Sequence, residues 1–252
     1  MCASCASDAC KTTDSSEEIF DEIDNLVPLR QGDTLAKCPY IYPIPIPELS
    51  DGVTTLPAWV QRFNVVVLSH SCDLEHSKTE LVLLIPIWEI TDYVKTCCER
   101  LRDDKEYCAR FVSKKKFEEK IVNEFIKNAT TDKLQGYTVI KGAPPSEKYP
   151  EGTEPWLVDF TNAYSLPCDY VDNFALMDAN NSKRLRLRPD YRIDLVCKFS
   201  YFLQRGVLPS KALDYDKVIK PITNELKVME LLVGVNLPEE SPPKPKSDTS
   251  SP

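Results

Sequence analysis

Two short apolar runs constrain the fold of this chain more than any other feature of its sequence. They cover Asn64–Ser69 (NVVVLS) and Leu81–Ile87 (LVLLIPI). Their length and their β-branched residues favour buried strands. The Gly32-Asp33 pair is a turn signal and predicts another strand over Thr34–Lys37, followed by a proline-dense loop from Pro39 to Pro57. Further strands are expected over Leu134–Ile140 and Trp156–Phe160.

Helical patterns follow the second apolar run and return near the end of the chain. Trp88–Phe111 mixes dense charge with apolar residues, and Lys114–Ala129 has one apolar stripe opposite a charged face. Arg188-Pro189 begins a third helix, because proline is tolerated in a first turn. Another helix is expected over Asp216–Leu232, and a short one over Glu17–Val27. The combined pattern predicts an α+β protein with a small, strongly bent sheet or barrel.

Charge is concentrated at the beginning of the chain. Residues 1–25 hold seven acids and one base, whereas the net charge of all 252 residues is −8. We expect residues 1–25 to form a flexible acidic arm containing cysteines, residues 26–236 a single α+β domain, and residues 237–252 a disordered tail. No segment is apolar enough for a membrane span or a signal peptide. A cytoplasmic protein without membrane contact is therefore expected.

The scarcity of two residue types removes several classes of function. The chain has seven glycines and two histidines, and it contains neither G-x-G-x-x-G nor G-x-x-x-x-G-K-[ST]. We therefore expect no nucleotide cofactor. Ten cysteines without an export signal suggest reduced thiols, metal ligands or a redox role.

The densest polar segment directly follows the first apolar run. It reads SHSCDLEH over residues 69–76 and contains both histidines of the chain. In one interpretation Cys72 is a nucleophile and His70 or His76 is its base. In a second, His70, Cys72 and His76 bind zinc, with a fourth ligand from Cys97, Cys98 or Cys108. In a third the segment is structural, and no cofactor is bound.

A basic stretch precedes the third helix. In a strand over residues 183–188, Arg184, Arg186 and Arg188 share one face, while Leu185 and Leu187 share the other. Three arginines on one face can hold phosphates, which makes RNA a candidate partner. Two alternatives remain open, namely a solvated face and pairing with the acidic arm.

The order of motifs in the first ninety residues resembles the PemK/MazF family of small β-barrel toxins. The matching positions are Gln31-Gly32-Asp33, Arg62 before the first apolar run, and Thr79 before the second. The resemblance implies an SH3-like barrel with a helical insertion and C-terminal helices. It also implies a metal-independent endoribonuclease in which Arg62 stabilises the phosphorane charge, Thr79 binds the phosphate and His70 assists with protons.

The whole chain is also similar to uncharacterised bacterial proteins that look like accessory components of antiviral-defence loci of the CRISPR or toxin type. Gln31-Gly32-Asp33, Ser69–Leu74 and Arg188–Arg192 carry this resemblance. The favoured hypothesis is a non-catalytic accessory or regulatory protein. It would bind a partner protein from the same operon, or nucleic acid through Arg184, Arg186, Arg188 and Arg192. The nuclease is the alternative.

Overall fold

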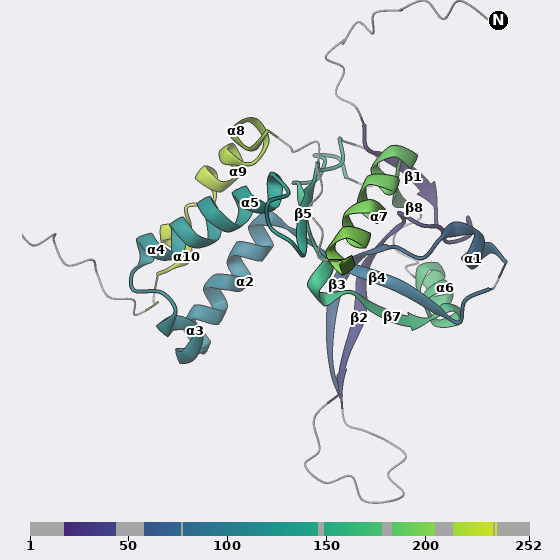
Figure 1. Cartoon of the computed structure of the whole chain (residues 1–252), viewed down its shortest axis with the longest axis horizontal. Coiled ribbons are helices and arrows are strands. Elements are labelled where there is room, and N and C mark those ends of the chain that lie inside the picture. The colour runs from purple at the N-terminus through teal and green to yellow at the C-terminus, as the bar shows by residue number, and fades with distance from the viewer. Residues whose placement is uncertain are drawn as a thin grey trace, which may run out of the picture.

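The computed structural model describes residues 18–43, 58–76, 78–145, 149–177, 183–204, 214–233 and 235. These residues confirm the mixed α+β class. They form two antiparallel sheets and a series of helices, most of which gather in a lobe to one side of the strands (Figure 1). The expected disordered tail over residues 237–252 lies outside the described residues.

The larger sheet has six strands, and one central strand is shared by two partners. β4 (Leu81–Glu89) pairs with β7 (Tyr164–Pro167) through its first four residues and with β6 (Trp156–Asp159) through its last three. The first half of β4 therefore pairs with β7, and its end pairs with β6. β2 (Thr34–Pro43) and β3 (Ala58–Val67) precede β4 in the sheet, and β5 (Tyr137–Ile140) follows β6. Within the described residues the sheet is open, and no pairing closes the expected barrel.

The smaller sheet corrects the interpretation of the N-terminal segment. β1 (Phe20–Asp24) pairs antiparallel with β8 (Lys183–Leu187), so the helix expected over Glu17–Val27 is wrong. Ile19 and Phe20 are buried in the main core. The strand forms because each of its residues pairs with a residue of β8. The spacing of apolar residues within the segment cannot show this distant pairing. Residues 18–25 thus belong to the folded body, and residues 1–17 lie outside the described part of the chain.

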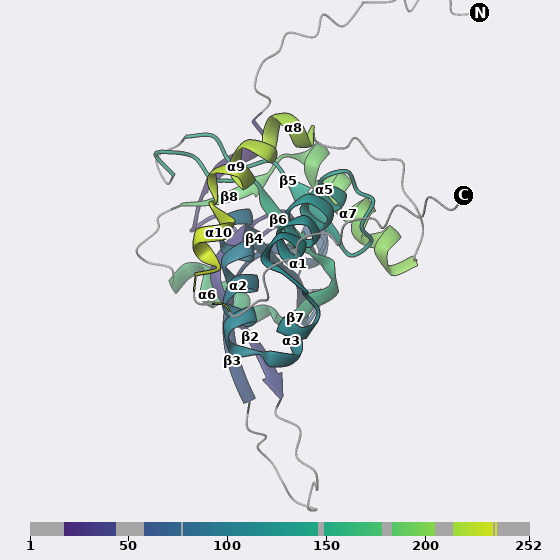
Figure 2. The same ribbon diagram turned by 90° about the vertical axis from the view of Figure 1, so that its left-hand side faces the viewer.

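The helices fall into two groups. Three lie against the strands: α1 (Ser71–Glu75), α6 (Cys168–Met177) and α7 (Pro189–Gln204). The lobe contains α2 (Ile90–Asp103), α3 (Lys105–Ala109), α4 (Lys114–Glu118), a π-helix (Glu119–Ile126), α5 (Lys127–Thr130), α8 (Tyr215–Val218), α9 (Lys220–Glu225) and α10 (Val228–Leu231). Figure 2 views the molecule from the lobe. None of the described helices is long and apolar enough to cross a membrane.

Several predicted helices are more interrupted than their apolar spacing suggests. The one expected over Trp88–Phe111 is broken at Asp104, whose extended backbone ends α2 and whose carboxylate accepts the N–H of Tyr107 to begin α3. The one expected over Asp216–Leu232 is broken at Lys227, which adopts a left-handed conformation with φ of 44°. The helix entered through Pro189 is confirmed.

The strands are covered on both faces near their middle. On one face Val66 and Ile85 pack with Leu195 and Phe199 of α7. On the other face Val65, Val67 and Leu84 pack with Val171 and Ala175 of α6. Both apolar runs of the sequence are thus buried strands, as predicted.

Candidate functional site

The basic stretch of β8 is largely buried. Arg184 and Arg186 share one face of the strand, as alternation predicts, but they are only 2% and 9% exposed. Both guanidinium groups bind the carboxylate of Asp33, which is fully buried. Arg184 Nε lies 2.7 Å from Asp33 Oδ2, and Arg186 donates to both carboxylate oxygens, with Nη2 2.9 Å from Oδ2. We call these three residues the Asp33 cluster.

Further donors of Arg184 and Arg186 bind backbone carbonyls. Arg184 Nη1 lies 3.1 Å from the carbonyl oxygen of Asn25, and its Nη2 lies 2.9 Å from that of Pro28. Arg186 Nη2 also reaches Pro28. The two arginines therefore hold the segment before β2 in place. A phosphate, the partner expected for these arginines, would have to reach two buried side chains that already bind Asp33 and backbone carbonyls.

The other two arginines of the basic region are also engaged. Arg188 lies 2.9 Å from Asp21 and 2.7 Å from Glu18, so the alternative of pairing with the acidic arm is confirmed for this residue. Arg192 Nη1 lies 3.4 Å from the carbonyl oxygen of Gln31. The four arginines do not form one open basic surface.

The three motifs behind the resemblance to defence-associated proteins meet in one place. The N–H of Gln31 donates to Ser71 Oγ at 3.2 Å, and its side-chain amide donates to the carbonyl of Leu68 at 2.7 Å. Arg192 contacts Gln31 from the other side, and the neighbouring Asp33 binds the arginines of β8. In the described structure these motif residues make framework contacts.

The histidine and cysteine segment forms a short helix with its cap. His70 is the N-cap of α1, and its Nδ1 accepts the backbone N–H of Cys72 at 3.3 Å. His76 follows the last residue of α1, and all three candidate side chains are exposed. Across the described residues, no group of three His, Cys, Asp or Glu side chains is placed to hold a metal ion. The cap is thus a histidine side chain rather than the expected serine or aspartate, and Cys72 is exposed rather than packed as a small apolar residue.

Arg62 and Thr79 lie at opposite ends of the same strand pair. Arg62 lies on β3 two residues before Asn64, the partner of Ile87 near the end of β4. Thr79 lies two residues before β4 begins, and its hydroxyl binds the backbone of Leu81. The eight steps of β4 between these ends each rise roughly 3.3 Å. Arg62 and Thr79 therefore do not form a common phosphate site.

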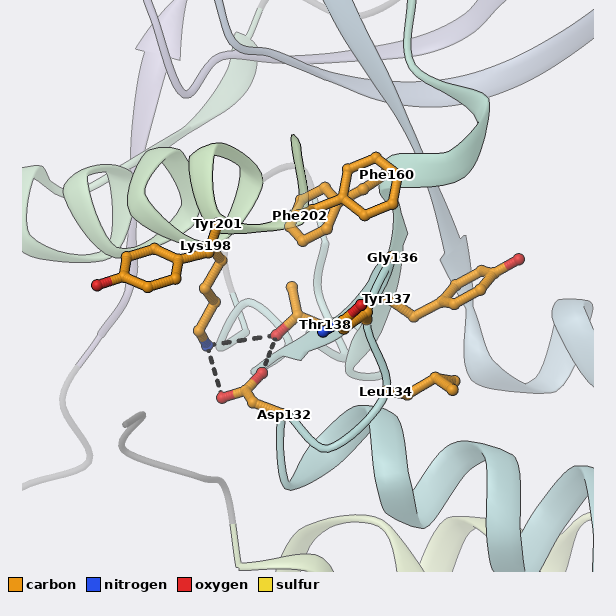
Figure 3. A pocket seen from close by; sticks show the side chains of 10 residues that line it. Asp132, Leu134, Gly136, Tyr137, Thr138, Phe160, Lys198, Tyr201 and Phe202 are labelled. Carbon is orange, nitrogen blue, oxygen red and sulfur yellow. Dashed lines mark hydrogen bonds and ion pairs between the residues drawn. The ribbon is translucent and has the colours of Figure 1, made fainter. Parts of the chain in front are cut away.

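Sequence reasoning missed a polar cluster between α7 and the start of β5. Lys198 Nζ lies 3.0 Å from Asp132 Oδ2 and 3.3 Å from Thr138 Oγ1, and Thr138 donates to Asp132 at 2.6 Å (Figure 3). These groups line a cavity of about 50 Å³. Thr138 is 1% exposed, and the lysine is neutralised by Asp132 and by Asp194 at 3.0 Å. The cluster ties α7 to the sheet, and Thr138 is closed to a substrate.

The buried thiols are poor nucleophiles. Burial raises the pKa of Cys38 and of Cys98 to about 11, and burial also raises the pKa of Cys97. Because the thiolate is the reactive form, a raised pKa lowers reactivity at neutral pH. These cysteines act as small apolar side chains of the core.

The far end of the β2–β3 pair is exposed. Residues 38–43 of β2 and 58–63 of β3 extend past the strands that flank them, and we call this pair of segments the ribbon (Figures 1 and 2). Trp59 is 70% exposed, Val60 58% and Ile41 52%. Val60 and Ile41 face each other across the strands. The prolines of this region predict a loop, but Pro39 and Pro43 both fall within β2.

A second exposed apolar area lies beside α6. Leu26, Leu176 and Met177 are 81%, 53% and 77% exposed, and the first two border a hollow of about 270 Å³. Arg184 also borders this hollow, but its guanidinium is already bound to Asp33 and backbone carbonyls. The hollow therefore offers apolar contact without a free charge from Arg184.

Comparison with protein-family models, curated proteins and solved structures finds no match to this chain. The PemK/MazF family and the defence-associated proteins therefore stay predictions from the order of motifs.

Proposed function

We propose that this chain is a cytoplasmic, non-catalytic accessory protein of a bacterial antiviral-defence locus, and that it acts by binding a partner protein. The observation that carries the proposal is the ribbon. It presents Ile41, Trp59 and Val60 to solvent on strands that project from the body. The resemblance of the motif order supplies the link to a defence locus.

The composition of the ribbon favours a protein partner. Grouped, exposed apolar side chains mark interaction sites, and tryptophan and tyrosine are common anchors of interfaces. Tyr42 lies opposite Trp59, and the rings of Tyr40 and Tyr42 are 4.2 Å apart. Burial of a large exposed aromatic side chain under a partner lowers the free energy of the complex, so such side chains favour binding.

Nucleic acid is the less favoured partner. Arg184 and Arg186 are buried, and Arg188 is paired with two acids. The net charge of the chain is −8, which opposes approach to a polyanion. The endoribonuclease is not favoured either, because Arg62 and Thr79 lie at opposite ends of β4.

The proposal is tested by co-expressing the tagged chain with each protein encoded beside its gene. We expect one neighbour to co-purify with the wild type and to be lost from the Trp59→Ser/Val60→Ser variant. Val112→Ser/Leu203→Ser is the matched control, because these side chains are 60% and 65% exposed in other parts of the chain.

Two outcomes would overturn the proposal. One is that no neighbour co-purifies with the wild type. The other is that purified protein cleaves a mixed RNA pool and that Arg62→Ala abolishes the cleavage, which would establish the nuclease in its place.

A further inference from the structure

The two outer edges of the ribbon differ in what they offer to another strand. β2 lies beside β3 along the whole ribbon, but β4 pairs only with Asn64–Val67 of β3. From Ala58 to Arg62 no described strand occupies the other side of β3. This stretch is the open edge of β3.

The register shows which backbone groups point outward from the open edge. The N–H of Leu68 donates toward β4, to Leu83, whereas that of Val67 donates toward the β2 side, to Asp33. Because successive residues of a strand alternate in direction, the N–H and C=O groups of Ala58, Val60 and Arg62 point away from β2. The open edge therefore presents three donors and three acceptors.

The outer edge of β2 is protected where the edge of β3 is not. The cross-strand partners of Arg62, Val60 and Ala58 are Pro39, Ile41 and Pro43. In the same alternation these β2 residues point outward from the other edge, and two of them have no N–H to donate. Proline is a common device against strand pairing at an edge, and no proline occurs in Ala58–Arg62.

The side chains around the open edge indicate the chemistry of an incoming strand. Val60 is apolar and exposed, and Arg62 beside it is an exposed cation. Opposite charges on cross-strand neighbours stabilise pairing. An acidic residue would lie next to Arg62 and an apolar one next to Val60.

We infer that the open edge of β3 binds an extended segment of the partner protein as an additional antiparallel strand, and that this segment has an acidic residue opposite Arg62 and an apolar residue two positions along, opposite Val60. The inference rests on the proposed function and adds its binding mode. A second copy of this chain is a poor occupant. The surface buried when two five-residue edges pair is far smaller than the roughly 800 Å² that each partner buries in a stable interface. A peptide strand needs less, since its backbone hydrogen bonds supply affinity.

The first test uses a synthetic probe. An eight-residue peptide of valine, threonine and glutamate, in which one glutamate and one valine lie two positions apart so that they can face Arg62 and Val60, is labelled with a fluorophore, titrated with the full chain and followed by anisotropy. We expect saturable binding, and we expect Arg62→Glu to weaken it about tenfold or more. A peptide with lysine in place of glutamate should bind at least about tenfold more weakly.

The second test compares the two edges with one kind of substitution. Val60→Pro removes an outward N–H from the open edge, and Ile41→Pro removes one from the opposite edge of the same cross-strand pair. We expect Val60→Pro to abolish binding of the probe and Ile41→Pro to leave it unchanged. Both variants must show the circular dichroism spectrum and urea midpoint of the wild type. If Val60→Pro does not fold, Ala58→Pro replaces it, because it removes another outward N–H from the same edge.

The outcomes separate this inference from the proposed function. If a co-purifying neighbour is lost from Trp59→Ser/Val60→Ser but kept by Val60→Pro, the ribbon binds through its side chains, and the inference is wrong while the proposed function stands. If the probe binds equally to Val60→Pro and Ile41→Pro, strand addition at β3 is excluded. If no neighbour co-purifies, the proposed function is lost as well.

Discussion

The two ends of the β2–β3 pair contain similar residues and have opposite environments. At the body end, Val65, Val66 and Val67 are fully buried between the core of α6 and the core of α7. At the ribbon end, Trp59 and Val60 of the same strand are more than half exposed. Residue type does not set this difference. It depends on whether α6, α7 and β4 cover the strand.

Because one end of β3 is buried and the other is exposed, the buried end contributes to stability and the exposed end is available for binding. The body end carries the core and lies beside the Asp33 cluster, since the N–H of Val67 donates to the carbonyl of Asp33 at 2.8 Å. The ribbon end contributes little burial, so its apolar side chains are free to contact a partner. Substitutions at the two ends should therefore separate these properties.

The largest contrast is expected between Val66→Asp and Val60→Asp. An aspartate at position 66 would place an unpaired carboxylate in the core, which costs upward of about 4 kcal/mol and would leave little native protein. The same change at position 60 meets solvent and should alter the free energy of unfolding by no more than about 0.5 kcal/mol. Urea unfolding followed by circular dichroism measures both. Equal losses would show that the ribbon is part of the core.

A smaller contrast is expected between two aspartates that bind arginine. Asp33→Asn leaves two buried guanidinium groups without a counter-charge and should lower the free energy of unfolding by about 3–5 kcal/mol. Asp21→Asn breaks a half-exposed pair with Arg188 and should lower the free energy of unfolding far less than Asp33→Asn does. The same urea experiment compares them. A loss below about 1 kcal/mol for Asp33→Asn would mean that the Asp33 cluster does not hold the body together.

The body end of the β2–β3 pair could be predicted from the sequence, and the ribbon end could not. Short β-branched runs identify buried strands because their composition suits burial on both faces, and Pro189 marked a helix because its first turn needs no donor. The strands of the ribbon were not predicted, because prolines such as Pro39 and Pro43 normally indicate a loop. They fit within β2 only because their nitrogens face outward from an unpaired edge, a property of the pairing rather than of the local sequence.

The candidate site residues were harder to predict than the core, for a similar reason. Alternation correctly placed Arg184 and Arg186 on one face, but only the folded chain shows that Asp33, some 150 residues earlier, neutralises them. The resemblance to the PemK/MazF family implies that Arg62 and Thr79 share one phosphate site. In the structure the length of β4 separates them. The polar pair of Asp132 and Lys198 had no sequence signal, because its members come from distant elements.

The stability of the body end should fall at alkaline pH. Cys38 lies where the ribbon leaves the body, and burial raises its pKa from 9.0 to about 11. Between pH 9 and 11 the unfolded chain loses this proton more readily than the folded chain, so the contribution of the neutral thiol is present below pH 9 and lost as pH rises. The difference between wild type and Cys38→Ala in the free energy of unfolding, measured with urea, should therefore shift by up to about 2 kcal/mol over this range. A constant difference would contradict the burial of Cys38.

The smallest effect is expected where the two ends meet. Cys38 is fully buried and Cys72 is exposed, so iodoacetamide followed by mass spectrometry should modify Cys72 first and Cys38 only when the structure opens. Trp59→Ser should leave the ratio of the two rates unchanged, because the ring contacts near Cys38 join Tyr40 to Phe63 and to Tyr164, and within the described structure none involves Trp59. Faster modification of Cys38 in this variant would mean that the ribbon end supports the body end, and a partner bound to the ribbon would then stabilise the core as well.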